Sequence, residues 1–314
     1  MTTRLTLRIR LALAQFALVG VMLTATSVAS AANTLVRVTT PLGGFTLELF
    51  DDIAPVTVTN FLNYVRSGRY NGTVVHRTEP GFVVQGGWLT FNESAQNFMP
   101  IAVDSTIVNE FNVSNTRGTI AMAKVAGDPN SASSQWFINT GNNAANLDAQ
   151  NGGFTAFGRV LDNGMAVVDA INALQRYSLT TGLETVPLVN FTALPLLSAN
   201  LVTLSMSVIE NLSANPNVFN STSNILQVKV NAGELGLLSL AFSLYSLEPE
   251  VKIQAISASV KALPATVEKI ATFNTATNEL TLPELVVGTA VAYTNVVFQL
   301  TDANQLIFTL KSAN

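Results

Sequence analysis

The stretch of sequence that decides the fold runs from Val74 to Leu89 and reads VVHRTEPGFVVQGGWL. Two β-branched runs flank Pro80-Gly81, and a Pro-Gly pair is strong turn chemistry, so the stretch predicts a β-hairpin. With the turn near Gly81, Arg77 and Gln85 fall opposite one another on the two strands. Cross-strand partners on one face lie roughly 5 Å apart at Cβ. The hairpin should therefore present a cation beside an amide, a patch suited to binding a polar backbone group.

The segments before this hairpin predict two strands and one helix. Residues 35–39 and 45–50 are expected to form strands, because the second of them alternates between apolar and polar residues. Pro55 then precedes apolar residues at the spacing of one helical face, and Gly68 provides a stop signal. The apolar residues of this expected helix are Val58, Phe61, Leu62 and Val65.

Downstream of the hairpin, short apolar segments between Asn- and Gly-rich loops predict further strands at residues 119–123, 135–138, 154–160 and 201–208. Alternation places Gln135 and Phe137 on one face of their strand and Trp136 on the other. A second helix is expected after a cap at Asp162 or Asn163. Many short strands with two helices favour a mainly β protein, a closed antiparallel barrel capped by helices.

Composition limits the possible functions. A chain of 314 residues with 48% hydrophobic and 11% charged residues is long enough for two domains and is not a disordered protein. A net charge of −4 argues against nucleic acid as a partner. Cysteine is absent and His76 is the single histidine, so disulfides, thiol chemistry, most zinc sites and a Ser-His or Cys-His catalytic group are not expected. We therefore expect no metal and no cofactor.

Residues 1–31 have the pattern of a secretory signal peptide. Arg4, Arg8 and Arg10 precede an apolar run, and Ala29-Ser30-Ala31 matches an A-x-A cleavage site. The apolar run is shorter than the ~20 residues that span a bilayer, although a retained anchor is the alternative. Cleavage would leave 13 of the 16 Lys and Arg residues against 20 Asp and Glu, a net charge of −7. We expect an exported protein, in the periplasm of a Gram-negative bacterium, with no stable membrane span after cleavage.

A series of motifs carries a family resemblance. In chain order they are His76-Arg77, Pro80-Gly81-Phe82, Gln85-Gly86-Gly87, Ala121-Met122-Ala123, Ser134-Gln135-Trp136-Phe137-Ile138 and Phe157-Gly158-Arg159-Val160. In this order, and at roughly this spacing, the sequence resembles a cyclophilin peptidyl-prolyl isomerase of the bacterial branch over residues 33–211. The resemblance implies an eight-stranded antiparallel barrel with a helix closing each end and a substrate groove on its outer wall.

The resemblance also implies roles for individual residues. Arg77 would act on the prolyl nitrogen of the substrate, and Gln85 would hold a substrate carbonyl. The implied partners are proline-containing peptide segments of unfolded or exported proteins. The other implied substrate-binding residues are Phe82, Val83, Ala123, Lys124, Gln135, Phe137, Leu147 and Phe154. His76 is interpreted as a packed structural residue, because rotation about a peptide bond requires no proton transfer.

Four positions depart from the family pattern. Val83 stands where the family usually has Met, and Lys124 replaces an Asn. Phe154 occupies a position that is His or Tyr elsewhere, and Asn146 replaces Trp or Phe. Without an aromatic residue at position 146, we expect weak cyclosporin binding and a smaller effect on catalysis.

The resemblance ends near residue 212. Residues 213–223 are rich in Asn and Ser and are predicted to be a linker, and residues 224–314 are predicted to form a small β-rich domain of unknown role. Two similar blocks, beginning at Leu226 and Leu280, suggest a duplication. Residues 234–247 could be helical instead of extended. We expect this domain to be a structural or docking module, since it has no acid pair, metal cluster or phosphate loop.

Three functions remain possible from the sequence. The chain could be an isomerase that accelerates X-Pro isomerisation during folding of exported proteins. It could be a Pro-peptide-binding module or holdase with little turnover. It could also be a scaffold or adhesion protein in which the C-terminal domain carries the function.

Overall fold

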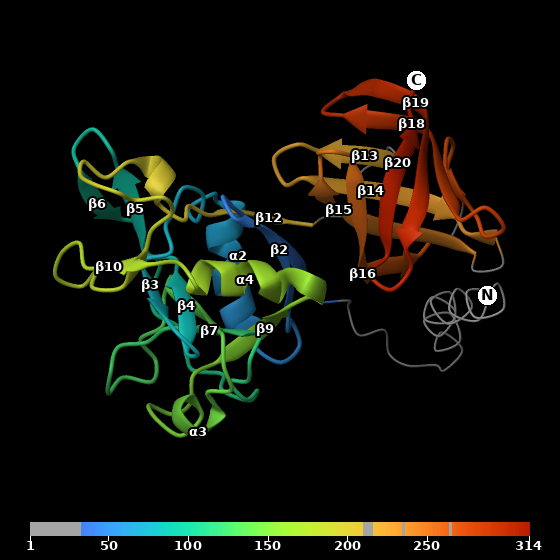
Figure 1. Ribbon diagram of the computed structural model, residues 1–314. Coiled ribbons are helices and arrows are strands. Elements are labelled where there is room, and N and C mark those ends of the chain that lie inside the picture. Colours follow the sequence, from blue (N-terminus) through green and yellow to red (C-terminus); the bar gives the residue numbers. More distant parts are fainter. Residues whose placement is uncertain (1–32, 210–215, 234–235, 264–265) are drawn as a thin grey trace, which may run out of the picture. The chain divides into compact units, whose positions relative to one another are not determined.

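A computed structural model describes residues 33–209, 216–233, 236–263 and 266–314, and the predicted signal peptide lies outside these ranges. Two compact units divide the chain, with a boundary between Val208 and Ile209. Within the described ranges, none of the helices has the length and apolar character needed to cross a membrane. Both units are built mainly of β-strands, as predicted (Figure 1).

The first unit contains an eight-stranded antiparallel sheet. Across the sheet the strands are β12 (Ser205–Val208), β1 (Leu35–Thr40), β2 (Gly43–Leu49), β9 (Ala156–Val160), β7 (Thr119–Met122), β8 (Trp136–Asn139), β4 (Val83–Gly86) and β3 (Arg77–Glu79). Its two ends are joined where the Val75 N–H donates to the Val202 carbonyl at 2.9 Å and the Leu204 N–H donates to the Thr73 carbonyl at 2.7 Å. These bonds curl the sheet on itself, which confirms the predicted eight-stranded architecture.

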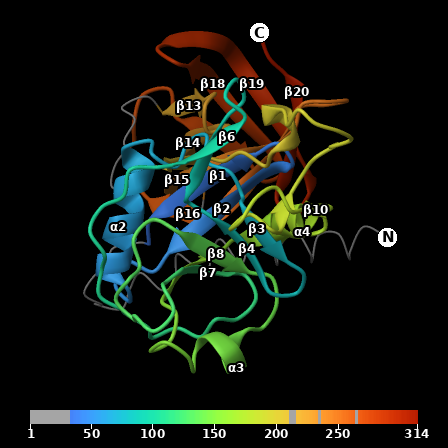
Figure 2. The ribbon, with the colours of Figure 1, turned by 90° about the vertical axis from the view of Figure 1, so that its left-hand side faces the viewer.

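Helix α2 (Pro55–Arg66) begins and ends as its sequence predicts. Pro55 fits the first turn, where its missing N–H would have no partner, and the Glu110 carboxylate accepts from the Val56 and Thr57 N–H groups at 3.1 and 2.7 Å. The helix ends before Gly68, which has a φ of +72°. In Figure 2, α2 lies to the left of β1 and β2.

The apolar face of α2 packs into the core of the curled sheet. Phe61 contacts Tyr70 and Phe157 with ring centroids 5.3 and 5.1 Å apart. Each fully buried large side chain of this kind contributes roughly 1.5–3 kcal/mol. Helix α4 (Met165–Asn172) buries Val168 and Ile171 in the same core. Both helices therefore cap the sheet as predicted.

Some local predictions were wrong or incomplete. A 3₁₀ turn (Asp162–Gly164) precedes α4, and neither Asp162 nor Asn163 caps the helix with its side chain, because Asp162 takes a φ of +51° in that turn. A third helix, α3 (Ala144–Leu147), is too short to produce a periodic pattern. The loop after the hairpin contains two further strands, β5 (Leu89–Asn92) and β6 (Asn97–Pro100).

A smaller apolar cluster lies under the segment between α4 and β12. This segment contains β10 (Arg176–Tyr177), β11 (Val186–Pro187) and a 3₁₀ turn at Ser198–Asn200. Its buried members, together with two from the hairpin region, are Val74, Leu89, Leu183, Val186, Leu188, Leu196 and Leu201. The cluster fixes this segment against the β5–β6 hairpin.

The second unit is a closed sheet. Its order is β13 (Asn217–Asn220), β14 (Ile225–Asn231), β15 (Leu237–Ser246), β16 (Lys252–Ala262), β20 (Ile307–Ser312), β19 (Ala290–Asp302), β18 (Glu279–Val287) and β17 (Ala271–Asn274). Additional parallel pairings of β13 with β18 and of β14 with β17 join its ends. Figure 1 shows these strands in orange and red.

The structure corrects two predictions in this unit. Residues 217–220 of the predicted linker form β13, because Asn220 to Asn224 make the turn of a hairpin with β14 rather than a connection between domains. The helical alternative for residues 234–247 is wrong, since Leu237–Ser246 pairs with strands on both sides. The predicted similarity of two blocks corresponds to the repeated order of a short strand followed by three long ones.

Candidate functional site

The hairpin of β3 and β4 brings the predicted cation and amide together. Arg77 and Gln85 are direct cross-strand partners, as predicted. The Arg77 Nη1 group donates to Gln85 Oε1 at 3.2 Å, and Gln85 Nε2 donates to Gln135 Oε1 at 3.0 Å. These bonds link three half-buried polar side chains in a row along one face of β3, β4 and the start of β8.

A carboxylate orients the Arg77 guanidinium. Arg77 Nε lies 3.5 Å from Glu79 Oε1, which also accepts from Thr185 Oγ1 at 3.3 Å. The guanidinium carbon lies 5.9 Å from the centre of the Phe82 ring. Nε and Nη1 are thus occupied within the protein, while Nη2 makes no hydrogen bond within the described part of the chain. This leaves a donor for an external group.

The predicted apolar residues gather in one cluster beside this polar row. Phe137 and Phe154 meet edge to face with centroids 5.8 Å apart. The buried members of the cluster are Val83, Ala121, Phe137, Leu147 and Ala156, and its partly buried members are Phe82, Val113, Ala123 and Phe154. Sequence reasoning missed Val113, which lies in a loop without a motif. The cluster is an apolar wall next to the free donor of Arg77.

Lys124 holds the loop that carries Phe154, a partly buried member of this cluster. Its Nζ donates to the carbonyls of Asn151 and Gly153 at 2.8 and 2.7 Å and lies 4.8 Å from the centre of the Phe154 ring. Burial lowers the pKa of Lys124, while Asp128 acts in the opposite direction. The lysine therefore ties the end of β7 to the loop that carries Phe154, a contact that the sequence did not reveal.

Three asparagines that contact the backbone of this cluster were also missed. Asn143 Nδ2 donates to the Phe82 carbonyl at 2.8 Å and to Asn139 Oδ1 at 2.7 Å. Asn115 Nδ2 donates to the Phe154 carbonyl at 2.9 Å. All three are buried, and together they fix the backbone at Phe82 and Phe154, two members of the cluster.

Asp148 anchors this network. Its carboxylate accepts from the Asn115 N–H at 2.9 Å, from Asn115 Nδ2 at 2.8 Å and from the Ser114 hydroxyl. Burial favours a higher pKa for Asp148, but the hydrogen bonds from Ser114 and Asn115 outweigh it and lower the pKa below its usual value. Asn146 on α3 is exposed and accepts a hydrogen bond from Gln150.

His76 is packed, as interpreted from the sequence. It is 3% exposed, and its ring meets Trp88 edge-on at 5.3 Å. Burial, with a further contribution from Arg77, lowers its pKa to about 4. A neutral, enclosed imidazole is a structural element of the hairpin and not a proton donor at neutral pH.

The two glycines after Gln85 allow Trp136 to pack against the hairpin. A Cβ on Gly86 would lie 2.8 Å from Trp136 Cζ2. Gly87 has a φ of +84°, and a Cβ there would lie 2.5 Å from the Ser134 carbonyl oxygen. The Gln-Gly-Gly motif is thus a requirement for close packing of β4 on β8, which sets the position of Gln85.

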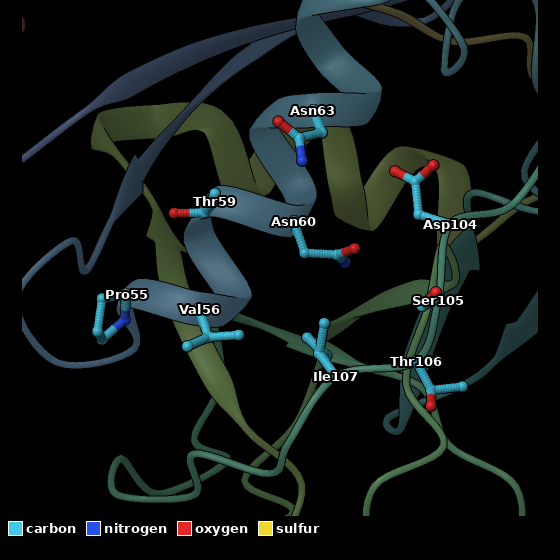
Figure 3. Close-up of a pocket in the computed structure, with 9 residues that line it drawn as sticks. All are labelled: Pro55, Val56, Thr59, Asn60, Asn63, Asp104, Ser105, Thr106 and Ile107. Carbon is cyan, nitrogen blue, oxygen red and sulfur yellow. The ribbon is translucent and has the colours of Figure 1, made fainter.

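A separate pocket of about 550 Å³ lies between α2 and residues 104–107 (Figure 3). Its walls include Val56, Asn60 and Ile107, and none of the predicted site residues lines it. Asp104, at its rim, is already held by Arg69 through bonds of 2.8 and 2.7 Å. Among the described residues, no cluster of His, Asp and Glu is arranged to hold a metal ion.

This chain is similar to several known proteins. A model of the family "cyclophilin type peptidyl-prolyl cis-trans isomerase/CLD" matches residues 35–192. A peptidyl-prolyl cis-trans isomerase of Acinetobacter baylyi is 42% identical over 143 residues, 45% of this chain and 72% of that protein. Peptidyl-prolyl cis-trans isomerase A of Dickeya dadantii is 43% identical over 158 residues, 49% of this chain and 80% of that protein. A crystal structure of a cyclophilin type isomerase of Cryptosporidium parvum has a TM-score of 0.44 at 22% identity, covering 59% of this chain and 99% of that one.

Proposed function

We propose that this chain, which belongs to the cyclophilin-type peptidyl-prolyl cis-trans isomerase family and is an isomerase of that type, accelerates X-Pro isomerisation during folding of exported proteins. Its substrates are proline-containing segments of unfolded chains. Without a catalyst, X-Pro exchange takes tens to hundreds of seconds and can limit folding.

The arrangement around Arg77 supports a mechanism without bond breaking. The rotational barrier of about 18–20 kcal/mol arises from resonance, which is lost when the prolyl nitrogen becomes pyramidal and gains a lone pair. A donor aimed at that nitrogen favours the twisted state over both planar isomers. The Nη2 group of Arg77 is such a donor, since Glu79 and Gln85 hold the other side of the guanidinium. Arginine suits this role because it stays charged.

Substrate placement follows from the surrounding side chains. The apolar wall of Val83, Phe137 and Leu147 accepts the proline ring. Gln85 and Gln135, already joined by a hydrogen bond, face the polar backbone on either side of the proline. The observation that carries the proposal is the position of a half-exposed guanidinium beside an apolar cluster on one face of the sheet.

A protease-coupled assay on an X-Pro peptide tests the proposal. We expect Arg77→Ala to lower kcat/KM by about 10²–10³-fold, the usual effect of removing one donor that stabilises a transition state. Arg159→Ala is the matched control, because Arg159 is a surface arginine whose ion pair with Glu48 lies outside the pocket. Equal loss of activity in both variants, or none in either, would contradict the assigned role of Arg77.

The same assay separates the isomerase from the two other readings, and a measurement of Pro-peptide binding then separates those two from each other. A holdase would bind Pro peptides with little turnover in wild type or variant. A scaffold protein led by the C-terminal unit would show neither turnover nor binding. Export is tested by N-terminal sequencing of the mature protein from a periplasmic fraction, with Ala32 expected as the first residue. A mature chain that still begins at Met1 would contradict it.

A further inference from the structure

The loop from Phe191 to Leu197 presents an apolar X-Pro segment to solvent. Leu194 is 76% exposed, the highest value among the large apolar side chains of the described residues, and Leu197 is 46% exposed. Pro195, between them in sequence, is also exposed. No charged residue occurs from Thr185 to Ile209. The loop thus offers neighbouring exposed apolar residues around an X-Pro bond, with no charged residue in the same segment.

This loop is held firmly at its base. The rings of Tyr177 and Phe191 meet edge to face, with centroids 4.9 Å apart. The Leu196 N–H donates to Gln96 Oε1 at 3.0 Å, and Gln96 Nε2 donates back to the Leu196 carbonyl at 2.9 Å. The Ser198 N–H donates to Glu93 Oε2 at 2.7 Å. Leu194 and Pro195 are therefore displayed on a fixed base, which reduces the conformational entropy lost on binding.

The groove on β3, β4 and β8 matches this segment in chemistry. It accepts an X-Pro bond with an uncharged backbone, and its apolar wall suits the exposed Leu194 and Pro195 side chains. The segment has no charge that would oppose the Arg77 guanidinium. We propose that the Leu194-Pro195 segment of one copy of this chain binds in the catalytic groove of a second copy, and this proposal rests on the proposed isomerase function.

A second copy is required because the loop cannot reach its own groove. Only residues 192–195 lie free between the contacts of Phe191 and Leu196, and four extended residues span at most about 14 Å. Figures 1 and 2 both show β6, near the base of the loop, at one end of the unit and α3, which carries Leu147, at the other. Occupancy of the groove by a second copy would make the isomerase self-inhibiting as its concentration rises.

The first experiment measures specific isomerase activity against protein concentration. Contacts of one short segment with a groove correspond to dissociation constants of roughly 10–1000 µM, so we expect activity per mole to fall at least about twofold between about 1 and about 500 µM. Pro195→Ala should abolish this fall and keep the activity of the dilute enzyme. Pro249→Ala is the matched control, since Pro249 is also exposed but lies between Glu248 and Glu250.

The second experiment uses a synthetic peptide with the sequence of residues 191–198 as the probe. We expect competitive inhibition of the dilute enzyme, and a weaker effect from the same peptide with Ala at position 195. Activity per mole that stays constant with concentration, together with no inhibition by the peptide, would overturn the proposal while leaving the isomerase function intact. Absence of activity at every concentration would instead contradict the proposed function itself.

Discussion

The single histidine makes the stability of the first unit sensitive to mild acid. His76 is enclosed in the folded state, where burial and the nearby Arg77 charge lower its pKa from 6.5 to about 4. In the unfolded chain it takes up a proton near its ordinary pKa. The unfolded state therefore binds more protons than the folded state between these two values, and stability falls as the pH falls through this window.

The size of the effect follows from the displacement of the pKa. One pKa unit corresponds to about 1.36 kcal/mol. When His76 is protonated in the unfolded state but not in the folded state, the free energy of unfolding therefore falls by at most about 3 kcal/mol. Between about pH 7 and about pH 5, the expected loss in free energy of unfolding is about 2 kcal/mol. That amount is a large fraction of the 5–15 kcal/mol typical of a folded domain.

Urea unfolding monitored by tryptophan fluorescence measures this loss. Both tryptophans, Trp88 and Trp136, lie in the first unit, so the signal reports on that unit. We expect the pH dependence between about pH 7 and about pH 5 to shrink in His76→Phe, which keeps a ring against Trp88 but does not titrate. His76→Asn serves as a second variant if the phenylalanine does not fit. Carboxylates such as Asp104 and Asp148 titrate in wild type and variants alike, so their contribution cancels in the difference.

The result that refutes this reasoning is an equal pH dependence in wild type and both variants. Measurements of catalysis test the structural role assigned to His76. Because rotation about X-Pro needs no proton transfer, kcat/KM should stay constant from about pH 8 to about pH 6 while the protein remains folded. A step in kcat/KM that vanishes in the His76 variants would assign the imidazole a catalytic role.

Three further predictions concern the pocket. Lys124→Met should raise KM more than it lowers kcat in the peptide assay, because it frees the loop that carries Phe154. Asn115→Ala should lower the free energy of unfolding by roughly 1–3 kcal/mol in urea titrations, because it leaves buried acceptors without donors, whereas an exposed asparagine such as Asn142 should tolerate the same change. Asn146→Trp should strengthen cyclosporin inhibition more than it changes kcat/KM, and sub-micromolar inhibition of the unaltered protein would contradict the prediction.

The hairpin could be predicted because its determinants are local. A Pro-Gly turn fixes the register, and the register alone places Arg77 opposite Gln85. The apolar wall needed more than local rules, since Phe137 and Phe154 come from segments that meet only in the folded sheet. Their place was inferred from family resemblance, and the structure brings them together.

Residues that support the pocket from behind could not be predicted in this way. Asn115, Asn139 and Asn143 belong to a chain rich in asparagine, and the same residue type forms exposed loops elsewhere. What distinguishes them is burial with paired donors and acceptors, which depends on segments far apart in sequence. The contacts of Lys124 could not be predicted for the same reason, because its two carbonyl acceptors lie in a later loop.

In the C-terminal unit, the sequence did not reveal that each half begins with a short strand, β13 in the first half and β17 in the second. Asn220 Oδ1 accepts from the Thr222 and Ser223 N–H groups, and Asn274 Oδ1 accepts from the Ala276 and Thr277 N–H groups. These turns are closed by Asn224 and Asn278, which have φ values of +55° and +58°. An Asn- and Ser-rich segment is expected of a linker as well as of a turn, so composition alone could not separate them.

The equivalence of these two turns also explains how the barrel of the second unit closes. Each half contributes one short strand that precedes its turn, and that strand pairs with a long strand of the other half, β13 with β18 and β17 with β14. The short strand of each half covers only part of its long neighbour: β13 pairs with residues 225–228 of β14, and β17 pairs with residues 279–281 of β18. The remaining ends, Val230–Asn231 and Val286–Val287, find partners on that edge only across the repeat. The two halves therefore depend on one another for stability, and a substitution that breaks the Asn274 turn should weaken the pairing of β14 as well as that of β18.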